Sequence, residues 1–204
     1  MDDAASHGMG YAAVRMGMTE EEYLAFERAS PEKHEYADGE IFARSGGTGD
    51  HSAVAANIIC EIGNALFGRK CRVNTSDMRI RIPANGRYVY PDASVVCARS
   101  EYTDEKRDTL VNPQIVIEVL SGSSEAYDRG DKFAQYQTIP SLQQYVIASQ
   151  DKPRIEVFTR QENDGGWLLR IYGPGEQATL ASIGGLIDVD RVYTDVLEAA
   201  QVQE

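Results

Sequence analysis

The pattern of hydrophobic and polar positions predicts a chain that mixes helices and strands. Thr19 precedes three glutamates with the spacing of a capping box, so we expect a helix to begin there. Asp38-Gly39 separates two short apolar-rich segments and predicts a tight β-hairpin, because this dipeptide tolerates positive φ angles. A longer helix is expected over about residues 50–67, with one apolar face formed by Val54, Ile58, Ile62 and Leu66.

Strand-like segments fill the middle and the end of the chain. Residues 78–82 alternate apolar side chains with Arg79 and Arg81, which predicts a strand with one buried and one basic face. Further strands are expected at residues 89–90, 93–97, 114–120, 144–149, 154–159 and 168–172, and further helices at residues 128–137 and 192–200. The fold class is therefore α/β or α+β, with mixed strands and helices outside them.

Length and composition favour one soluble domain. The chain has 204 residues, of which 42% are hydrophobic, enough for one ordinary core. Residues 1–17 show no clear period, so we expect a loose lead-in followed by a single domain over residues 18–204. No apolar run of about 18 residues or more occurs and the start does not resemble a secretory signal, so a cytoplasmic protein without membrane contact is expected. Three widely spaced cysteines are expected to be reduced core thiols, with neither a disulfide framework nor a zinc site: Cys60, Cys71 and Cys97.

Charge argues against long-range attraction to nucleic acid. The chain carries 20 basic and 32 acidic residues, a formal net charge of −12. A local basic cleft and a bound cation would still permit contact with a phosphate backbone. The side chains expected to supply such a cleft are Arg79, Arg81, Arg87, Arg129 and Lys132.

One carboxylate stands where a buried strand would normally carry none. Glu118 lies inside the apolar stretch at residues 114–121, and burying an unpaired carboxylate costs several kcal/mol, on the order of the penalty for desolvated ions. Its partner should be a metal ion or a lysine, with pairing to an arginine as the structural alternative. A second acid, Asp92, follows Pro91 upstream, where a simple turn aspartate is the alternative. If their strands are neighbours, both carboxylates and the Val119 carbonyl suit a hard cation such as Mg²⁺ or Mn²⁺.

Lys132 is the candidate ammonium beside these acids. Helical spacing places a polar cluster on one face, formed by Asp128, Lys132, Gln135 and Tyr136. An exposed i,i+4 pair of Asp128 and Lys132, worth about 0.3–0.5 kcal/mol, is the alternative explanation. Two acids on neighbouring strands with one lysine are the minimum set for metal-dependent cleavage of a phosphodiester.

Several segments in a fixed order also resemble a known family. They are residues 18–24, 36–41, 90–96, 115–121, 127–136 and 139–147, together with His51. In these segments the chain resembles the Uma-type restriction endonuclease family, a branch of the PD-(D/E)xK nuclease superfamily. The resemblance spans most of residues 18–160 and implies a restriction-endonuclease-like fold, in which a mixed central sheet is flanked by helices.

The resemblance also implies roles for individual residues. Asp92 and Glu118 match the two metal-binding acids, and Lys132 matches a lysine that has moved from its usual place, here Leu120, to the following helix. Glu40, or less favourably Glu35, matches an additional acid from the N-terminal part, although both also suit a solvated hairpin. Two further residues are candidates for support: His51, unless it caps a helix or lies on the surface, and Asp77, unless it is a simple strand entry.

We therefore expect a metal-dependent endonuclease that acts on DNA as a cytoplasmic enzyme, with homodimerisation suited to cutting both strands. Two alternatives stay open. A catalytically silent binding or regulatory module would retain the fold without the metal site. A nuclease acting on RNA or on a small phosphorylated substrate would use the same residues and fits the acidic chain better.

Overall fold

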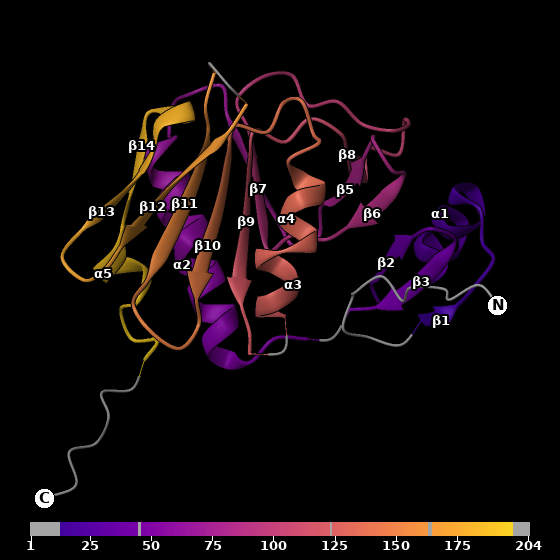
Figure 1. Ribbon diagram of the computed structural model, residues 1–204, viewed down its shortest axis with the longest axis horizontal. Coiled ribbons are helices and arrows are strands. Elements are labelled where there is room, and N and C mark those ends of the chain that lie inside the picture. Colours follow the sequence, from indigo (N-terminus) through magenta and orange to yellow (C-terminus); the bar gives the residue numbers. More distant parts are fainter. Residues whose placement is uncertain (1–12, 45, 123, 163–164, 198–204) are drawn as a thin grey trace, which may run out of the picture.

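A six-stranded mixed sheet lies at the centre of the fold (Figure 1). The computed structural model describes residues 13–44, 46–122, 124–162 and 165–197. Strands β9 and β10 run parallel, whereas the other neighbours in this sheet are antiparallel. In spatial order the strands are β12 (Trp167–Tyr172), β11 (Ile155–Arg160), β10 (Gln144–Ser149), β9 (Ile115–Leu120), β7 (Ala93–Val96) and β4 (Arg72–Thr75).

A second six-stranded sheet lies at the N-terminal end of the molecule, together with α1 (Glu20–Ala29) (Figure 1). Thr19 and Glu22 form the capping box predicted at the start of α1. Asp38 and Gly39 have φ angles of 52° and 87°, which confirms the tight hairpin. In spatial order the strands are β1 (Ala13–Arg15), β3 (Glu40–Ala43), β2 (His34–Ala37), β6 (Arg87–Val89), β5 (Arg79–Ile82) and β8 (Thr109–Leu110).

Helices cover both faces of the central sheet. The apolar face of α2 (Gly49–Ala65) packs against alternate β9 side chains such as Ile117, as its periodicity predicts. The opposite face of β9 packs against Phe133 and Tyr136 of α4 (Asp131–Tyr136). Figure 1 shows α2 behind the sheet and α3 (Glu125–Arg129) and α4 in front of it. The remaining elements are the β13 (Gln177–Leu180) and β14 (Gly185–Asp188) hairpin, a 3₁₀ turn (Ala181–Ile183) and α5 (Val189–Val192).

Glycine divides the helix expected at residues 128–137. Gly130 has φ −104° and ψ −100°, so α3 ends and α4 begins there. A Cβ at this position would lie 3.1 Å from the carbonyl oxygen of Ala126, which explains why a residue without a side chain suits this break. The break does not remove Lys132 from the sheet, because α4 packs directly on β9.

Three further expectations were wrong. Residues 13–15, placed in a loose lead-in, form β1 and pair with β3, while residues 1–12 lie outside the described part. Cys71 and Cys97 are not free thiols but form a disulfide, and Cys60 is exposed rather than in the core. The disulfide joins positions next to the Arg72–Val96 pair of β4 and β7, so the cysteines face each other across neighbouring strands. The final helix was expected at residues 192–200, whereas α5 ends at Val192 and residues 198–204 are outside the described part.

The basic face expected on β5 is absent as well. Arg79 is only 3% exposed and donates hydrogen bonds to Thr109 and Tyr90. Arg81 binds both carboxylate oxygens of Glu20. Arg81 holds α1 against the N-terminal sheet, and Arg79, which also lies 3.3 Å from Asp108, holds the end of the loop before β8, so both charges are used within the fold.

Within the described ranges, no helix is long and apolar enough to cross a membrane.

Candidate active site

A cavity of about 760 Å³ lies where the N-terminal sheet, the start of α2 and the adjoining ends of β7 and β9 meet. Side chains from the N-terminal sheet, α2 and β9 line it, as do Asp92 just before β7 and residues of α3 and α4. The predicted residues that line it are Glu35, His51, Asp92, Glu118, Asp128 and Lys132. The fold therefore brings together groups that are up to 97 positions apart in the sequence.

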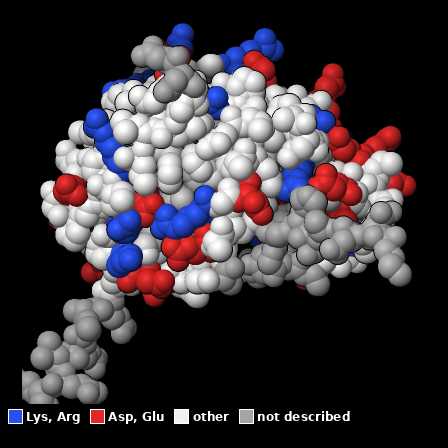
Figure 2. All heavy atoms as spheres, viewed as in Figure 1, with Lys and Arg blue, Asp and Glu red and all other residues white. Residues whose placement is uncertain are grey.

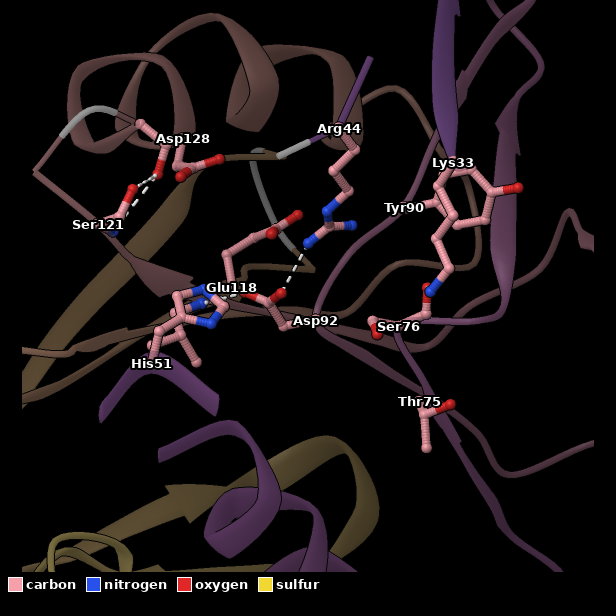
Figure 3. A network of polar contacts seen from close by, with 12 residues as sticks. Lys33, Arg44, His51, Thr75, Ser76, Tyr90, Asp92, Glu118, Ser121 and Asp128 are labelled. Carbon is pink, nitrogen blue, oxygen red and sulfur yellow. Dashed lines mark hydrogen bonds and ion pairs between the residues drawn. The ribbon is translucent and has the colours of Figure 1, made fainter. Parts of the chain in front are cut away.

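Asp92 and Glu118 are neighbours across two antiparallel strands. Ala93 of β7 pairs with Ile117 of β9, so Asp92, one position earlier, comes level with Glu118. The Val119 backbone N–H donates to Asp92 Oδ2 at 2.7 Å, which fixes this carboxylate where β7 begins. Figure 3 shows both acidic side chains directed into the same polar network. The juxtaposition expected from the sequence is confirmed.

Glu118 is 2% exposed and has its positive partner. Lys132 Nζ lies 2.8 Å from Glu118 Oε1, and the Tyr136 hydroxyl donates to the same oxygen at 2.9 Å. Burial raises the pKa of Glu118 to about 8, and the attraction of Lys132 only partly opposes this rise. Glu118 is thus a carboxylate that the protein alone does not fully stabilise in its charged form.

The Lys132 ammonium is held between two acids. Its Nζ lies 3.3 Å from Asp128 Oδ1 as well as beside Glu118. Burial by itself lowers the pKa of Lys132, but the attraction of Glu118 and Asp128 outweighs burial and raises it well above the usual value. Both Asp128 and Lys132 are buried, at 3% and 5% exposure, so the alternative of an ordinary exposed i,i+4 pair is wrong.

Arg44, which the sequence did not single out, completes the group. It follows β3 and its Nη2 donates to Asp92 Oδ1 at 2.7 Å (Figure 3). His51 Nε2 lies 3.3 Å from Asp92 Oδ2. Burial alone would raise the pKa of Asp92, but His51 and Arg44 outweigh it and lower that pKa, while the same contact raises the pKa of His51. No local motif marks Arg44, because its role depends on how the N-terminal sheet meets β7.

The remaining predicted residues are placed differently from one another. Glu35, the less favoured acid, is 8% exposed, lines the cavity and accepts the Tyr90 backbone N–H at 3.1 Å. Glu40 pairs with Ala37 beside the hairpin turn and is not among the lining residues. Asp77 is an exposed partner of Lys33. Gln135 does not line the cavity either, whereas Tyr136 acts through its bond to Glu118.

The donor set fits a hard divalent cation that keeps some of its waters. Asp92, Glu118 and Val119 all line the cavity, and carboxylate and backbone carbonyl oxygens are the ligands that such a cation takes. In the described part of the chain, no three His, Cys, Asp or Glu side chains are grouped as ligands for one ion. An ion here would therefore be held by two carboxylates rather than by a closed protein cage, as is usual for Mg²⁺.

Charge around this cavity differs from the expected basic cleft. Of the five basic residues expected there, only Lys132 lines the cavity. Arg129 instead binds Glu156, and Arg87 binds Asp38. On the face in Figure 2, basic side chains form small groups beside acidic ones, and acidic side chains gather over the end that contains α1.

Known proteins are similar to this chain in sequence or in fold. Residues 20–189 match the family Uma2, described as "Putative restriction endonuclease". Two Synechocystis proteins are similar: Uncharacterized protein slr1290 is 38% identical over 177 residues, 86% of this chain and 91% of that protein. Uncharacterized protein sll1609 is 34% identical over 152 residues, 74% of this chain and 85% of that protein. A crystal structure from Anabaena variabilis, described as "a putative nuclease belonging to DUF820", has a TM-score of 0.70 at 19% identity and covers 88% of this chain and 99% of its own, which shows a shared fold.

Proposed function

Because the chain belongs to the Uma2 family of restriction endonuclease-like proteins, we propose that it is a metal-dependent nuclease that hydrolyses phosphodiester bonds in DNA. One observation carries this proposal: Asp92 and Glu118 share one cavity wall, with the Lys132 ammonium 2.8 Å from Glu118. The choice of DNA rests on the family's description as restriction endonucleases.

The charge of the cavity supports a need for metal. Its lining contains five acidic side chains and three lysine or arginine side chains, Lys33, Arg44 and Lys132, together with His51, whose pKa Asp92 raises. A divalent cation would offset the repulsion between these acids and a phosphodiester. Asp92 and Glu118 would hold a divalent cation, Mg²⁺ or Mn²⁺, which polarises the phosphate and lowers the pKa of a bound water.

The chain's own groups have separable roles. Lys132 presents a fixed ammonium to the negative charge that develops on the phosphate, because Glu118 and Asp128 hold it in place. Tyr136 orients Glu118 through its hydroxyl, and His51 orients Asp92. Positioning of this kind is what lets carboxylates hold a cation at one point of the cavity.

Nicking of supercoiled plasmid DNA tests the proposal. With Mg²⁺ or Mn²⁺ the wild-type protein should nick the plasmid, and chelator should stop it. Asp92→Asn and Glu118→Gln should lower the nicking rate steeply, whereas Glu40→Gln, which removes an acid outside the cavity lining, should not. An RNA of matched sequence, tested in parallel, would be cut in preference if the substrate class is wrong. Failure to cut either nucleic acid with either metal would favour a silent binding module.

A further inference from the structure

Two buried hydrogen-bond donors point to an anion site in this cavity. Arg44 Nη1 and the Tyr127 hydroxyl are both buried and have no hydrogen-bond partner within the part of the chain that the structure describes. Both residues line the cavity that contains Asp92 and Glu118. A buried donor left without an acceptor costs about 1–3 kcal/mol, so two in one cavity call for an acceptor from outside the chain.

Arg44 is held so that one of its donors stays available. Without cation or substrate, Asp92 holds Nη2 at 2.7 Å, and because the guanidinium is planar this contact also sets the direction of Nη1 in that state. Figure 3 shows the guanidinium beside the carboxylates of both Asp92 and Glu118. Arg44 thus donates a hydrogen bond to a carboxylate oxygen of Asp92 that a cation would also bind.

Tyr127 adds a neutral donor from α3. Its ring packs against Ala37 and Phe42 of the N-terminal hairpin, and the Lys132 Nζ lies 6.0 Å from the ring centroid. Burial raises the pKa of Tyr127 well above its usual value, so the hydroxyl keeps its proton and remains a donor. A guanidinium and a hydroxyl together suit the anionic oxygens of a phosphate.

We propose that Arg44 and Tyr127 bind the non-bridging oxygens of the substrate phosphodiester, and that Arg44 releases Asp92 to do so when a cation enters. This inference rests on the proposed function. Without substrate, Arg44 and the cation compete for Asp92. With substrate, the phosphate offers Arg44 another acceptor, so phosphodiester and cation each strengthen the binding of the other.

Calorimetric titration of the metal-free protein with Mn²⁺ tests this exchange without any catalytic readout. The titration is done with and without saturating dimethyl phosphate, a small phosphodiester anion. Wild-type protein should bind Mn²⁺ about fivefold or more tightly when dimethyl phosphate is present. Arg44→Gln should bind Mn²⁺ about fivefold or more tightly than wild type without dimethyl phosphate, and adding dimethyl phosphate should tighten its Mn²⁺ binding much less than that of wild type. Tyr127→Phe should match wild type with Mn²⁺ alone and show a reduced gain.

Two variants serve as controls. Lys33→Gln removes a positive charge from the cavity rim without touching Asp92, since Lys33 bonds to Asp77 and to the Ser76 carbonyl. It should change Mn²⁺ affinity far less than Arg44→Gln and keep the gain from dimethyl phosphate. Arg44→Lys retains a cation beside Asp92 but lacks the forked donors of arginine. It serves as a second variant in case Arg44→Gln does not fold, and dimethyl phosphate should tighten its Mn²⁺ binding much less than that of wild type.

The outcomes separate the two claims. If a Glu118-dependent Mn²⁺ site is present but its affinity changes neither in Arg44→Gln nor with dimethyl phosphate, the proposed exchange of Arg44 from Asp92 to the phosphate is overturned. The nuclease proposal is left intact by that result. Absence of such a site in both wild type and Arg44→Gln overturns the nuclease proposal and the exchange together.

Discussion

Two buried glutamates lie in one row of the central sheet and are treated in opposite ways. Glu118 of β9 and Glu156 of β11 both pair with Ile147 of β10, and each is 2% exposed. Glu156 receives two hydrogen bonds from Arg129, at 2.6 and 2.9 Å, and one from Arg154 at 2.7 Å. Burial alone would raise the pKa of Glu156, but these bonds outweigh it and lower that pKa.

Glu118 has less compensation and a cavity in front of it. One ammonium, shared with Asp128, and one tyrosine hydroxyl contact it, and burial raises its pKa to about 8. A buried acid is therefore not in itself a sign of function. An acid that lacks full compensation and faces a cavity is the stronger candidate for binding a cation.

The largest expected effect separates the two acids by activity. Glu118→Gln should lower nicking by about 10³-fold, because loss of a cation ligand removes several kcal/mol of transition-state stabilisation. Glu156→Gln, the matched control, should stay within about twofold of wild type. Initial rates on supercoiled plasmid measure both, and equal losses would remove the distinction.

A smaller loss of activity is expected for the cations that serve each acid. Lys132→Gln should slow nicking by about 10²-fold, because the developing negative charge loses its ammonium. Arg154→Gln, which removes one partner of Glu156, should leave the rate unchanged. A nicking rate for Lys132→Gln equal to that for Arg154→Gln would show that the Lys132–Glu118 pair is only structural.

The two substitutions should rank in the opposite order when stability is measured instead of activity. Glu156→Gln should lower the free energy of unfolding by about 1–3 kcal/mol, a discounted figure because the partner arginines are about one-third exposed. Glu118→Gln in chelator should cost less than this or even stabilise the fold, since a desolvated charge disappears while Asp128 still pairs with Lys132. Urea denaturation curves measure both values, and a larger cost for Glu118→Gln would contradict the account.

The smallest effect is a difference in pH dependence. The folded-state pKa of Glu118 is about 8 against an ordinary 4.5, so its contribution to stability is present below about pH 4.5 and is lost as pH rises through 8. In chelator, the free energy of unfolding of Glu118→Gln should therefore rise relative to that of wild type as pH increases from about 4.5 to 8. The pKa of Glu156 is lowered, so its stabilisation is present above about pH 4.5 and is lost as pH falls. The penalty of Glu156→Gln should shrink in acid, and parallel pH profiles for the two variants would contradict these directions.

The sequence predicted those parts of the fold that local patterns determine. The capping box at Thr19, the Asp38-Gly39 hairpin and the apolar strand around Glu118 are short-range signals, and the structure confirms all three. The juxtaposition of Asp92 and Glu118 was also expected if their strands are neighbours, which β7 and β9 are, and the lysine expected beside the buried charge of Glu118 is Lys132. Short strands such as β4, β13 and β14 carry weak periodicity over four residues each and escaped detection.

Long-range contacts account for what the sequence missed. Arg44 reaches Asp92 across 48 positions, and the Cys71–Cys97 disulfide depends on β4 pairing with β7. The sequence favoured Glu40 over Glu35, but Glu35 is the acid that lines the cavity. Both acids lie on the same hairpin, so only the packing of β2 in the folded protein distinguishes them. Charge pattern alone likewise suggested a basic face on β5, because nothing local revealed that Glu20 pairs with Arg81.

Anomalous diffraction from crystals soaked in Mn²⁺ would show whether Asp92 and Glu118 hold a cation between them. An anomalous peak between Asp92 and Glu118 is expected in the wild-type protein and in Glu156→Gln, and it should be lost in Glu118→Gln. A peak elsewhere, or one that survives in Glu118→Gln at full height, would contradict the assignment of these two acids as the cation site.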